Sequence, residues 1–390
     1  MDMKILDQAD VQGKKVLLRV DFNVPLDNGE VAWWEDWRIK ATLPTIRYLL
    51  ERDARVIIMC HLGRPEGKLD SAFSVAPLAK RLATLLQMPV KKLDDCIGEA
   101  VQQEINALQP KGIVMLENLR FHPEEEQGGV AFAQELAQLG AVYVDDAFGA
   151  VHRAHASISV ITQFLPSFAG LLLAREVQEL SQAIQNPHEP LAVVMGGIKI
   201  KTKEPTIVNI LPKAAHIMLG GGLANTLLAA RKVAVGASLI DAREVAENKF
   251  GFSINDPKIL VPLDVTVSIA DDGQKPFRET DVTDIHADEM ILDIGPKTIS
   301  AYAQALAGSG TIIWNGNMGK SELPDCSNGT MYIAQAIAQI GATSIVGGGD
   351  TVAFISQNGM MDNFSHVSTG GGSMLEFLAG YDLPGIAALQ

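Results

Sequence analysis

The sequence predicts an α/β protein of two domains, each a parallel sheet flanked by helices, with one helix joining them. Short apolar runs alternate with amphipathic segments from one end of the chain to the other, which is typical of βαβ units with buried parallel strands. The length of 390 residues favours two domains, and an apolar content of 47% suffices for two cores. We therefore expect two Rossmann-like domains.

The first half is expected to contain four strands separated by helices. The strands are short apolar runs, and the helices carry apolar residues at helical spacing. The predicted strands span residues 15–21, 55–60, 113–117 and 142–146. The predicted helices span residues 38–51, 75–86 and 132–139.

The same rhythm resumes after a long helix predicted for residues 171–184. The sequence Asn-Pro-His-Glu-Pro at residues 186–190 ends that helix, because a residue before proline is disfavoured in helical conformation. A helix between two domains suggests a hinge rather than a loose tether. The strands of the second half are expected at residues 191–195, 216–219, 259–262, 311–314 and 343–346.

Composition excludes several classes of partner. The net charge of −14 argues against nucleic acid and anionic membranes, since both select a basic surface. The N-terminus lacks the regions of a signal peptide, and no apolar run reaches the ~18–20 residues of a membrane span. Cys60, Cys96 and Cys326 contain no CxxC pair, so neither disulfides nor zinc are expected. We expect a cytoplasmic protein.

Three Gly-Gly-Gly turns follow predicted strands in the second half, at residues 220–222, 347–349 and 370–372. One such turn alone is more simply a helix cap, but three strand–glycine–helix junctions favour a shared anion site. Glycine lets backbone N–H groups face a ligand, and a helix N-terminus adds partial positive charge. Such junctions meet at the carboxyl edge of a parallel sheet. We interpret them as a nucleotide site, with Asp350 available to Mg²⁺ and Thr351 to a phosphate oxygen.

Two lysines, Lys199 and Lys203, follow a further turn at Gly196 and Gly197. On a helix, residues four apart share one face, where like charges repel unless an anion lies between them. A solvated basic turn explains the pair equally well in isolation. Beside the glycine turns, phosphate binding is favoured.

Basic residues gather at the predicted strand ends of the first half. Taken alone, each arginine is more simply explained as a surface ion pair, and each histidine as a structural residue. A His-x-x-His pair without a third ligand is only a weak sign of zinc. Their convergence in an acidic protein instead indicates an anion pocket, because guanidinium groups match carboxylate and phosphate oxygens. The cluster comprises Arg38, Arg64, Arg120, Arg153, His61, His122, His152 and His155.

Together these motifs resemble the phosphoglycerate kinase family, over nearly the whole chain and in the family's order. The motifs are VDFNVP at 20–25, HLGRP at 61–65, LENLRF at 116–121, DAFG at 146–149, HRAH at 152–155, WNG at 314–316, GGGD at 347–350 and STGGG at 368–372.

The resemblance implies reversible phosphoryl transfer between 1,3-bisphosphoglycerate with ADP and 3-phosphoglycerate with ATP, in glycolysis and gluconeogenesis. It implies Mg²⁺ as the cofactor of the nucleotide, in-line transfer with hinge closure, small-molecule partners and a monomer. It also implies a 3-phosphoglycerate domain of residues 1–168 with the tail 378–390, a hinge helix at 169–186 and a nucleotide domain at 187–377.

The resemblance further implies roles for individual residues. The expected catalytic residues are Arg38, Lys199, Gly371 and Gly372. The expected substrate-binding residues are Asp21, Phe22, Asn23, Arg38, His61, Leu62, Gly63, Arg64, Arg120 and Arg153. The expected nucleotide-binding residues are Gly197, Lys199, Lys203, Gly221, Gly222, Leu239, Leu292, Asn315, Glu322, Gly348, Gly349, Asp350 and Thr351, with Glu322 at the ribose and Asp350 at the metal.

Some positions depart from the family's pattern. Residues 31–37 before Arg38 contain three tryptophans and two apparent insertions. Other departures are Cys60, Asp145, Ile198, Asn317, Lys320 and Ser321. Two alternatives therefore stand beside the kinase: a non-catalytic anion-binding protein with an altered Arg38 loop, and an enzyme that phosphorylates another carboxylic acid. Lys199, Asp350 and the glycines at 370–372 favour catalysis over binding alone.

Overall fold

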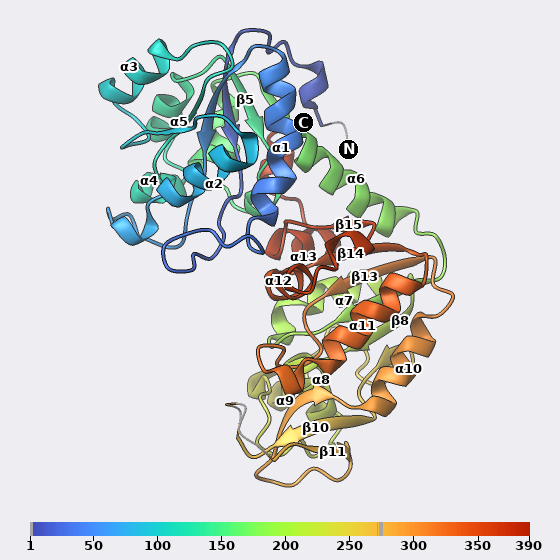
Figure 1. The fold of residues 1–390 in the computed structure, drawn as a ribbon. Coiled ribbons are helices and arrows are strands. Elements are labelled where there is room, and N and C mark those ends of the chain that lie inside the picture. The colour runs from blue at the N-terminus through green and yellow to red at the C-terminus, as the bar shows by residue number, and fades with distance from the viewer. Residues whose placement is uncertain (1–2, 271, 273–275) are drawn as a thin grey trace. The chain divides into compact units, whose positions relative to one another are not determined.

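The computed structural model describes residues 3–270, 272 and 276–390, so residues 1–2 of the predicted first domain lie outside the described residues (Figure 1). The chain separates into two compact units. The first unit is Met1–Gln178 with Asp382–Gln390, and the second unit is Glu179–Tyr381. Helix α6 (Leu171–Gln185) contains the point where the chain passes from one unit to the other.

The first unit contains a six-stranded sheet in the order β3-β4-β2-β1-β5-β6, with every neighbouring pair parallel. Its strands are β1 (Lys15–Arg19), β2 (Arg55–Met59), β3 (Lys91–Lys92), β4 (Ile113–Met115), β5 (Val142–Asp145) and β6 (Ser167–Ala169). Its helices, besides the start of α6, are α1 (Trp37–Glu51), α2 (Ala76–Leu86), α3 (Glu99–Ala107), α4 (Pro123–Gln127), α5 (Val130–Ala137) and α14 (Pro384–Ala387).

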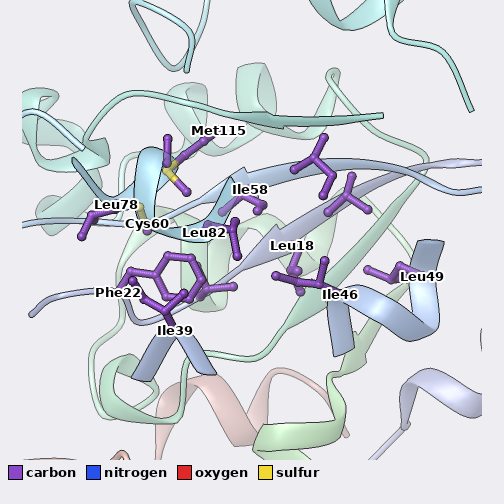
Figure 2. Packing of buried hydrophobic residues seen from close by; sticks show 14 of the residues in the cluster. Leu18, Phe22, Ile39, Ile46, Leu49, Ile58, Cys60, Leu78, Leu82 and Met115 are labelled. Carbon is purple, nitrogen blue, oxygen red and sulfur yellow. The ribbon is translucent and has the colours of Figure 1, made fainter. Parts of the chain in front are cut away.

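Helices cover both faces of this sheet because successive strand residues point in opposite directions. Leu18 of β1 packs with Ile46 of α1 and Leu82 of α2 in one buried cluster, which Figure 2 shows. The preceding residue, Leu17, belongs to a second cluster with residues of α3 and α5. The strands β1, β2, β4 and β5 are therefore buried on both sides, as their apolar sequences predict. The edge strands β3 and β6 are not predicted by the sequence analysis, and β3 consists of two lysines that are not buried.

The C-terminal tail belongs to the first unit. The N–H of Gly385 in α14 donates to the carbonyl of Val151 at 2.8 Å, and the N–H of Lys4 donates to the carbonyl of Leu389 at 3.2 Å. Ile386 and Leu389 are buried. The chain thus ends by packing on the unit where it began.

The second unit has its own six-stranded parallel sheet in the order β15-β14-β13-β7-β8-β9. Its strands are β7 (Leu191–Met195), β8 (Ala214–Leu219), β9 (Ile259–Leu260), β13 (Thr311–Asn315), β14 (Thr343–Gly347) and β15 (His366–Val367). Its helices, besides the end of α6, are α7 (Glu204–Ile210), α8 (Gly221–Ala230), α9 (Ala242–Glu247), α10 (Pro296–Leu306), α11 (Asn328–Gln339), α12 (Gly349–Gln357) and α13 (Gly372–Leu378).

The two parallel sheets confirm the predicted fold class, but the second unit also contains an antiparallel sheet that the sequence analysis does not predict. Its strands are β10 (Asp264–Ser268), β11 (Arg278–Asp281) and β12 (Met290–Ile294), in the order β11-β10-β12. The sequence of β11, Arg-Glu-Thr-Asp, is polar, so no apolar run identifies it as a strand.

Asp146, directly after β5, caps helix α6 from outside the helix. Its Oδ1 accepts hydrogen bonds from the N–H groups of Leu172 at 2.9 Å and Leu173 at 3.1 Å. These are among the N–H groups that a helix leaves without partners at its start. A side chain on Gly170 would place its Cβ 2.1 Å from this oxygen, so a glycine is required there.

Burial raises the pKa of the Asp146 carboxyl to about 7, against the opposing effect of Thr45 and the two α6 N–H groups. The folded protein therefore retains a proton that the unfolded chain loses above its ordinary pKa of 3.8. Folding stability contributed by this group is complete at low pH and declines as the pH rises from about 4 to about 7.

Replacing Asp146 with asparagine should remove this pH dependence while keeping an oxygen to cap α6. Between pH 5 and pH 8, the free energy of unfolding of the wild type should fall by roughly 2–3 kcal/mol more than that of Asp146→Asn. Urea unfolding at both pH values measures the difference. Equal declines in the two proteins would show that Asp146 is ionised in the folded state.

Candidate active site

A cavity of about 610 Å³ opens at the carboxyl edge of the second unit's parallel sheet. Residues from the turns after β7, β8, β13 and β14 line it, because parallel strands bring these turns to one edge. All the residues expected to bind nucleotide line this single cavity: Gly197, Lys199, Lys203, Gly221, Gly222, Leu239, Leu292, Asn315, Glu322, Gly348, Gly349, Asp350 and Thr351.

Backbone hydrogen bonds hold three of the turns against one another. The N–H of Gly197 donates to Asn317 at 3.1 Å, that of Gly221 to Met318 at 2.8 Å and that of Leu223 to Gly197 at 2.9 Å. This packing leaves no room for side chains. A Cβ on Gly316 would lie 2.5 Å from both the carbonyl oxygen of Gly196 and the ammonium of Lys203.

The prediction that Lys199 and Lys203 share a helix face is wrong. Lys199 has extended backbone, a single turn of 3₁₀ helix follows it, and α7 begins only at Glu204. Lys203 is buried, and its ammonium donates to the backbone carbonyls of Gly196 and, at 3.2 Å, Asn315. Lys203 thus ties the turn after β7 to the end of β13.

The two lysines therefore differ in electrostatic character. Burial lowers the pKa of Lys203 to about 8, although the carboxylate of Asp350 acts in the opposite direction. Lys199 is exposed at the cavity wall, and its ammonium forms no hydrogen bond or ion pair with any residue in the described part of the chain. Lys199 is the cation available to a ligand, and Lys203 the one that holds the turns.

Polar groups at the start of α12 face the same cavity. Asp350 is exposed in the first turn of this helix, whereas Thr351 is fully buried and its hydroxyl accepts the N–H of Gly316 at 3.0 Å. Asn315 is only 3% exposed, and its Nδ2 has no hydrogen-bond partner among the described residues. A buried amide donor without a partner at a cavity wall indicates a position for a ligand acceptor.

The antiparallel sheet supplies an apolar part of the cavity that the sequence analysis missed. Met290 and Ile291 of β12 line it beside the expected Leu292, and Pro262 and Leu239 add further apolar surface. The cavity therefore combines an apolar wall with glycine turns and charged groups, as a nucleotide requires. The sequence analysis does not predict β12, although its residues Met-Ile-Leu-Asp-Ile form a short apolar run that was an available signal.

The third glycine turn lies beside this cavity but does not line it. Residues 370–372 follow β15, which pairs with β14, so the turn neighbours the turn that contains Gly348. Gly371 has φ +43°, a Cβ added to it would meet no described atom within 4 Å, and α13 begins at Gly372. The expected convergence of three glycine turns on one cavity thus holds for two of them.

The first unit brings most of the predicted basic residues together. Burial lowers the pKa of His61, and the neighbouring charges of Arg19, Arg120 and Arg38 lower it further. Arg120 donates to the carbonyl of Gly63 at 2.8 Å. The N–H of Gly63 donates in turn to Asn23 at 2.9 Å. Arg64 and Arg153 are exposed members of the same group, since the charge of Arg64 acts on Arg120 and that of Arg153 acts on His155.

Arg38 is held by two contacts despite the unusual residues before it. Its guanidinium forms an ion pair with the carboxylate of Asp21 and lies over the ring of Trp37, 5.0 Å from the ring centroid. Its side chain remains 16% exposed. The structure therefore gives no support to a disrupted Arg38 loop.

Three predicted members need correction. The side chains of Phe22, which Figure 2 labels, and of Leu62 are buried in one hydrophobic cluster, so only their backbones can face a ligand. His122 turns away from the arginines, because its Nε2 bonds to Asp95 at 2.6 Å and its ring stacks on Phe132. His152 stays in the cluster and accepts a hydrogen bond from Arg153 at 2.9 Å.

The sequence analysis missed Arg19, the last residue of β1. Its side chain is 1% exposed and donates to Ser157 at 2.9 Å and to the carbonyl of Val20. Its Nη2 lies 3.1 Å from Nδ1 of His61. Behind it, Ser157 donates to the buried carboxylate of Glu125 at 2.6 Å. A charged residue ending an otherwise apolar strand was the available signal.

Charge at this site comes from guanidinium groups rather than histidines. Burial and the neighbouring arginines lower the pKa of His155 to about 3, and the same causes act on His61. Both imidazoles are therefore neutral at physiological pH, where they can donate or accept hydrogen bonds without adding charge. The arrangement can bind a small anion through arginine.

The comparisons with known proteins agree with the family resemblance that the sequence motifs indicate. The family model "Phosphoglycerate kinase" matches residues 6–381. The phosphoglycerate kinase of Herpetosiphon aurantiacus is 46% identical over 383 residues, which is 97% of this chain and 96% of the relative. That of Pelotomaculum thermopropionicum is 43% identical over 396 residues, 100% and 99% of the two chains. The crystal structure of the Pyrococcus horikoshii phosphoglycerate kinase superposes with a TM-score of 0.90 at 31% identity. The superposition covers 100% of this chain and 98% of the Pyrococcus chain.

Gly316→Ala should disrupt the nucleotide cavity. The φ of +95° at Gly316 would strain the backbone of an alanine. The added methyl group would also collide with the carbonyl oxygen of Gly196 and the ammonium of Lys203, each 2.5 Å away. Gly308→Ala is the matched control, with φ +81° but no described atom within 4 Å of the added methyl group. Gly308→Ala should cost only the strain of about 1–2 kcal/mol. Gly316→Ala should cost more and weaken ADP binding at least ~10-fold, as measured by calorimetry. Equal losses in both variants would contradict the tight turn packing.

Proposed function

The chain belongs to the phosphoglycerate kinase family, and we propose how its own residues carry out the family's reaction. As a member, it is a phosphotransferase with a carboxyl group as acceptor, which acts in glycolysis. The reaction moves a phosphoryl group between 1,3-bisphosphoglycerate and ADP. The observation that carries the assignment of residues is the single cavity lined by every expected nucleotide-binding position.

The nucleotide binds in the cavity of the second unit. The turns that contain Gly197, Gly221 and Gly348 line the phosphate part of the cavity, and the unpartnered amide of Asn315 donates to a phosphate oxygen. The N–H groups of Gly197 and Gly221 are not donors to the phosphates, because they bond to the carbonyls of Asn317 and Met318. The apolar residues around Leu292 and Leu239 receive the base, and Glu322 at the cavity binds the ribose. Lys203 acts by keeping the turns in place.

The residues present fit Mg²⁺ bound with the nucleotide. This hard cation takes oxygen ligands, commonly one or two carboxylates with phosphate oxygens, and Asp350 offers an exposed carboxylate at the cavity. The buried ammonium of Lys203 nearby cannot replace the cation, because backbone carbonyls occupy its donors. When bound, Mg²⁺ neutralises phosphate charge and orients the nucleotide.

The acid 3-phosphoglycerate binds in the first unit. Arg64, Arg120 and Arg153 bind its phosphate and carboxylate oxygens, and neutral His61 donates or accepts a hydrogen bond. Asp21 and Asn23 are hydrogen-bond partners for its hydroxyl, and Asp21 also orients Arg38. Bending near α6 brings the two ligands together and excludes water, which would otherwise accept the phosphoryl group.

The chemical step needs positioning and charge stabilisation rather than a general base. A carboxylate with a pKa near ~4 is already ionised at neutral pH. The transferring phosphoryl group passes through a loose transition state, which electrostatic contacts stabilise. Lys199 and Arg38 provide the cations for these contacts, and the N–H groups of Gly371 and Gly372 complete them. Family membership favours phosphoglycerate over another carboxylic acid as the acceptor.

The protein acts as a cytoplasmic monomer on small molecules in this proposal. None of the helices in the described part of the chain has the length and apolarity to cross a bilayer. The net charge of −14 supports the exclusion of nucleic acid as a partner.

The purified chain should phosphorylate 3-phosphoglycerate with ATP only when a divalent cation is present. A coupled assay that consumes 1,3-bisphosphoglycerate measures the rate, and excess EDTA should abolish it. Magnesium added back beyond the chelator should restore it. Full turnover in EDTA, or none with magnesium, would contradict the proposal.

The two lysines should give opposite kinetic signatures. Lys199→Ala should cut kcat by roughly 10²-fold or more and change KM little, because Lys199 has no ground-state partner among the described residues and acts on the transition state. Lys203→Met should instead raise the Kd for ADP, because the turns lose their internal cation. Steady-state kinetics and calorimetry separate the two. A variant Lys199→Ala with normal kcat and a raised KM for ATP would show that Lys199 only binds nucleotide.

A further inference from the structure

A second group of metal-ligating side chains lies in the first unit, outside the proposed reaction. Asp95 and Cys96 are in the loop between β3 and α3, and His122 lies at the turn before α4. One ligand atom of each lies within 4.8 Å of the others. The fold brings them together, since Asp95 and His122 are 27 residues apart in the chain.

We propose that Asp95, Cys96 and His122 form a binding site for a thiophilic divalent cation, with Zn²⁺ as the natural candidate. This site is separate from the Mg²⁺ of the nucleotide and does not depend on the proposed function. Sequence spacing contains no sign of it, because the cysteine has no partner cysteine nearby in the chain.

The three side chains are already held in place. A single oxygen, Oδ1 of Asp95, accepts the N–H of Cys96 at 2.6 Å and lies 2.6 Å from Nε2 of His122. The His122 ring stacks on Phe132, with ring centroids 4.9 Å apart and planes 26° from parallel. The thiol of Cys96 donates to the carbonyl of Glu117 at 3.0 Å. Small movements about these contacts would bring three ligand atoms onto one ion.

The chemistry of the ligands selects the ion. Thiolate, imidazole and carboxylate are the three ligand types of zinc, at about 2.0–2.3 Å, and three protein ligands leave a fourth position for water. Magnesium prefers oxygen ligands alone and would not compete. On binding, the Cys96 thiol releases its proton to solvent and a metal–sulfur bond forms. His122 binds as neutral imidazole with its proton on Nδ1, so two negative ligands balance the charge of the ion.

The surroundings permit entry from solvent. The side chain of Asp95 is 55% exposed and that of His122 is 24% exposed, while Cys96 is buried beneath them. Within the described residues, no lysine or arginine forms an ion pair with Asp95, so no cation needs to be displaced. The nearby carboxylate of Glu117 is occupied by Lys92, Ser74 and two backbone N–H groups, which leaves the ligand set at three.

The test uses the full chain, reduced and freed of metal with a chelator that is then removed. Zn²⁺ is titrated in competition with a chromophoric chelator, and Co²⁺ serves as an optical probe of thiolate and tetrahedral coordination. The wild type should bind one equivalent of each metal, and the Co²⁺ complex should show a sulfur-to-metal charge-transfer band.

Two ligand variants and one matched control decide the outcome. Cys96→Ser keeps a donor for the Glu117 carbonyl, and His122→Gln keeps a polar side chain near Asp95, so circular dichroism should confirm that both fold. Each should weaken Zn²⁺ binding at least ~10-fold, on the scale of losing a group that supports a metal, and Cys96→Ser should lose the charge-transfer band. Cys326→Ser, which changes another buried cysteine in the second unit, should bind as the wild type does.

Absence of one-equivalent binding in the wild type would overturn the site. So would unchanged affinity in both folded ligand variants, or a charge-transfer band that survives Cys96→Ser. Any of these results would leave Asp95 and His122 as a hydrogen-bonded pair alone.

Discussion

A parallel strand covered by helices on both faces can place a polar side chain only at its ends. All five residues of β7 are buried and apolar, and the first residues after it, Gly196 and Gly197, already belong to the turn at the nucleotide cavity. Because the strands run the same way, this constraint sends all the polar chemistry of each unit to one edge. Arg19, the last residue of β1, shows what a buried charge at a strand end requires: its guanidinium has Ser157, a backbone carbonyl and His61 around it.

The same constraint explains how much the sequence could predict. The apolar runs identify β1, β2, β4 and β5 of the first parallel sheet but not its edge strands β3, which is Lys-Lys, and β6, which is three residues long. The motifs after the predicted strands identify the cavity positions. The sequence could not show β11, whose residues are polar on both faces, and the apolar residues of β12 alone do not show that this strand supplies a cavity wall. It also could not separate Lys199 from Lys203, because their spacing suggested a helix where the chain forms one tight turn. Which basic residue meets which acid is a tertiary fact, as His122 and Asp95 show.

In the proposed function, the two units bind anions by different means. The first unit uses guanidinium groups, with its buried histidines kept neutral by burial and by those same groups. Its charge therefore does not titrate near neutral pH. The second unit uses backbone N–H groups of glycine turns and keeps its buried ammonium on backbone carbonyls. Lys199 is exposed at the cavity and has no ion-pair partner among the described residues, which suits a reaction where positive charge must follow one phosphoryl group.

Carboxyl groups on strands or just after them cap the starts of four helices. These helices gain hydrogen-bond acceptors for their first N–H groups from distant parts of the chain rather than from their own first residues. Glu117 accepts the N–H of Val75 before α2, Asp146 accepts two at α6, Asp264 accepts two at α10 and Asp293 accepts one at α11. The arrangement is costly, since burial raises the pKa of both Asp146 and Asp293 to about 7. The benefit lies in position, because Asp293 on β12 fixes the cavity wall to α11 through Gly329. At Asp293, burying a carboxyl group thus costs some stability and holds one wall of the cavity in place.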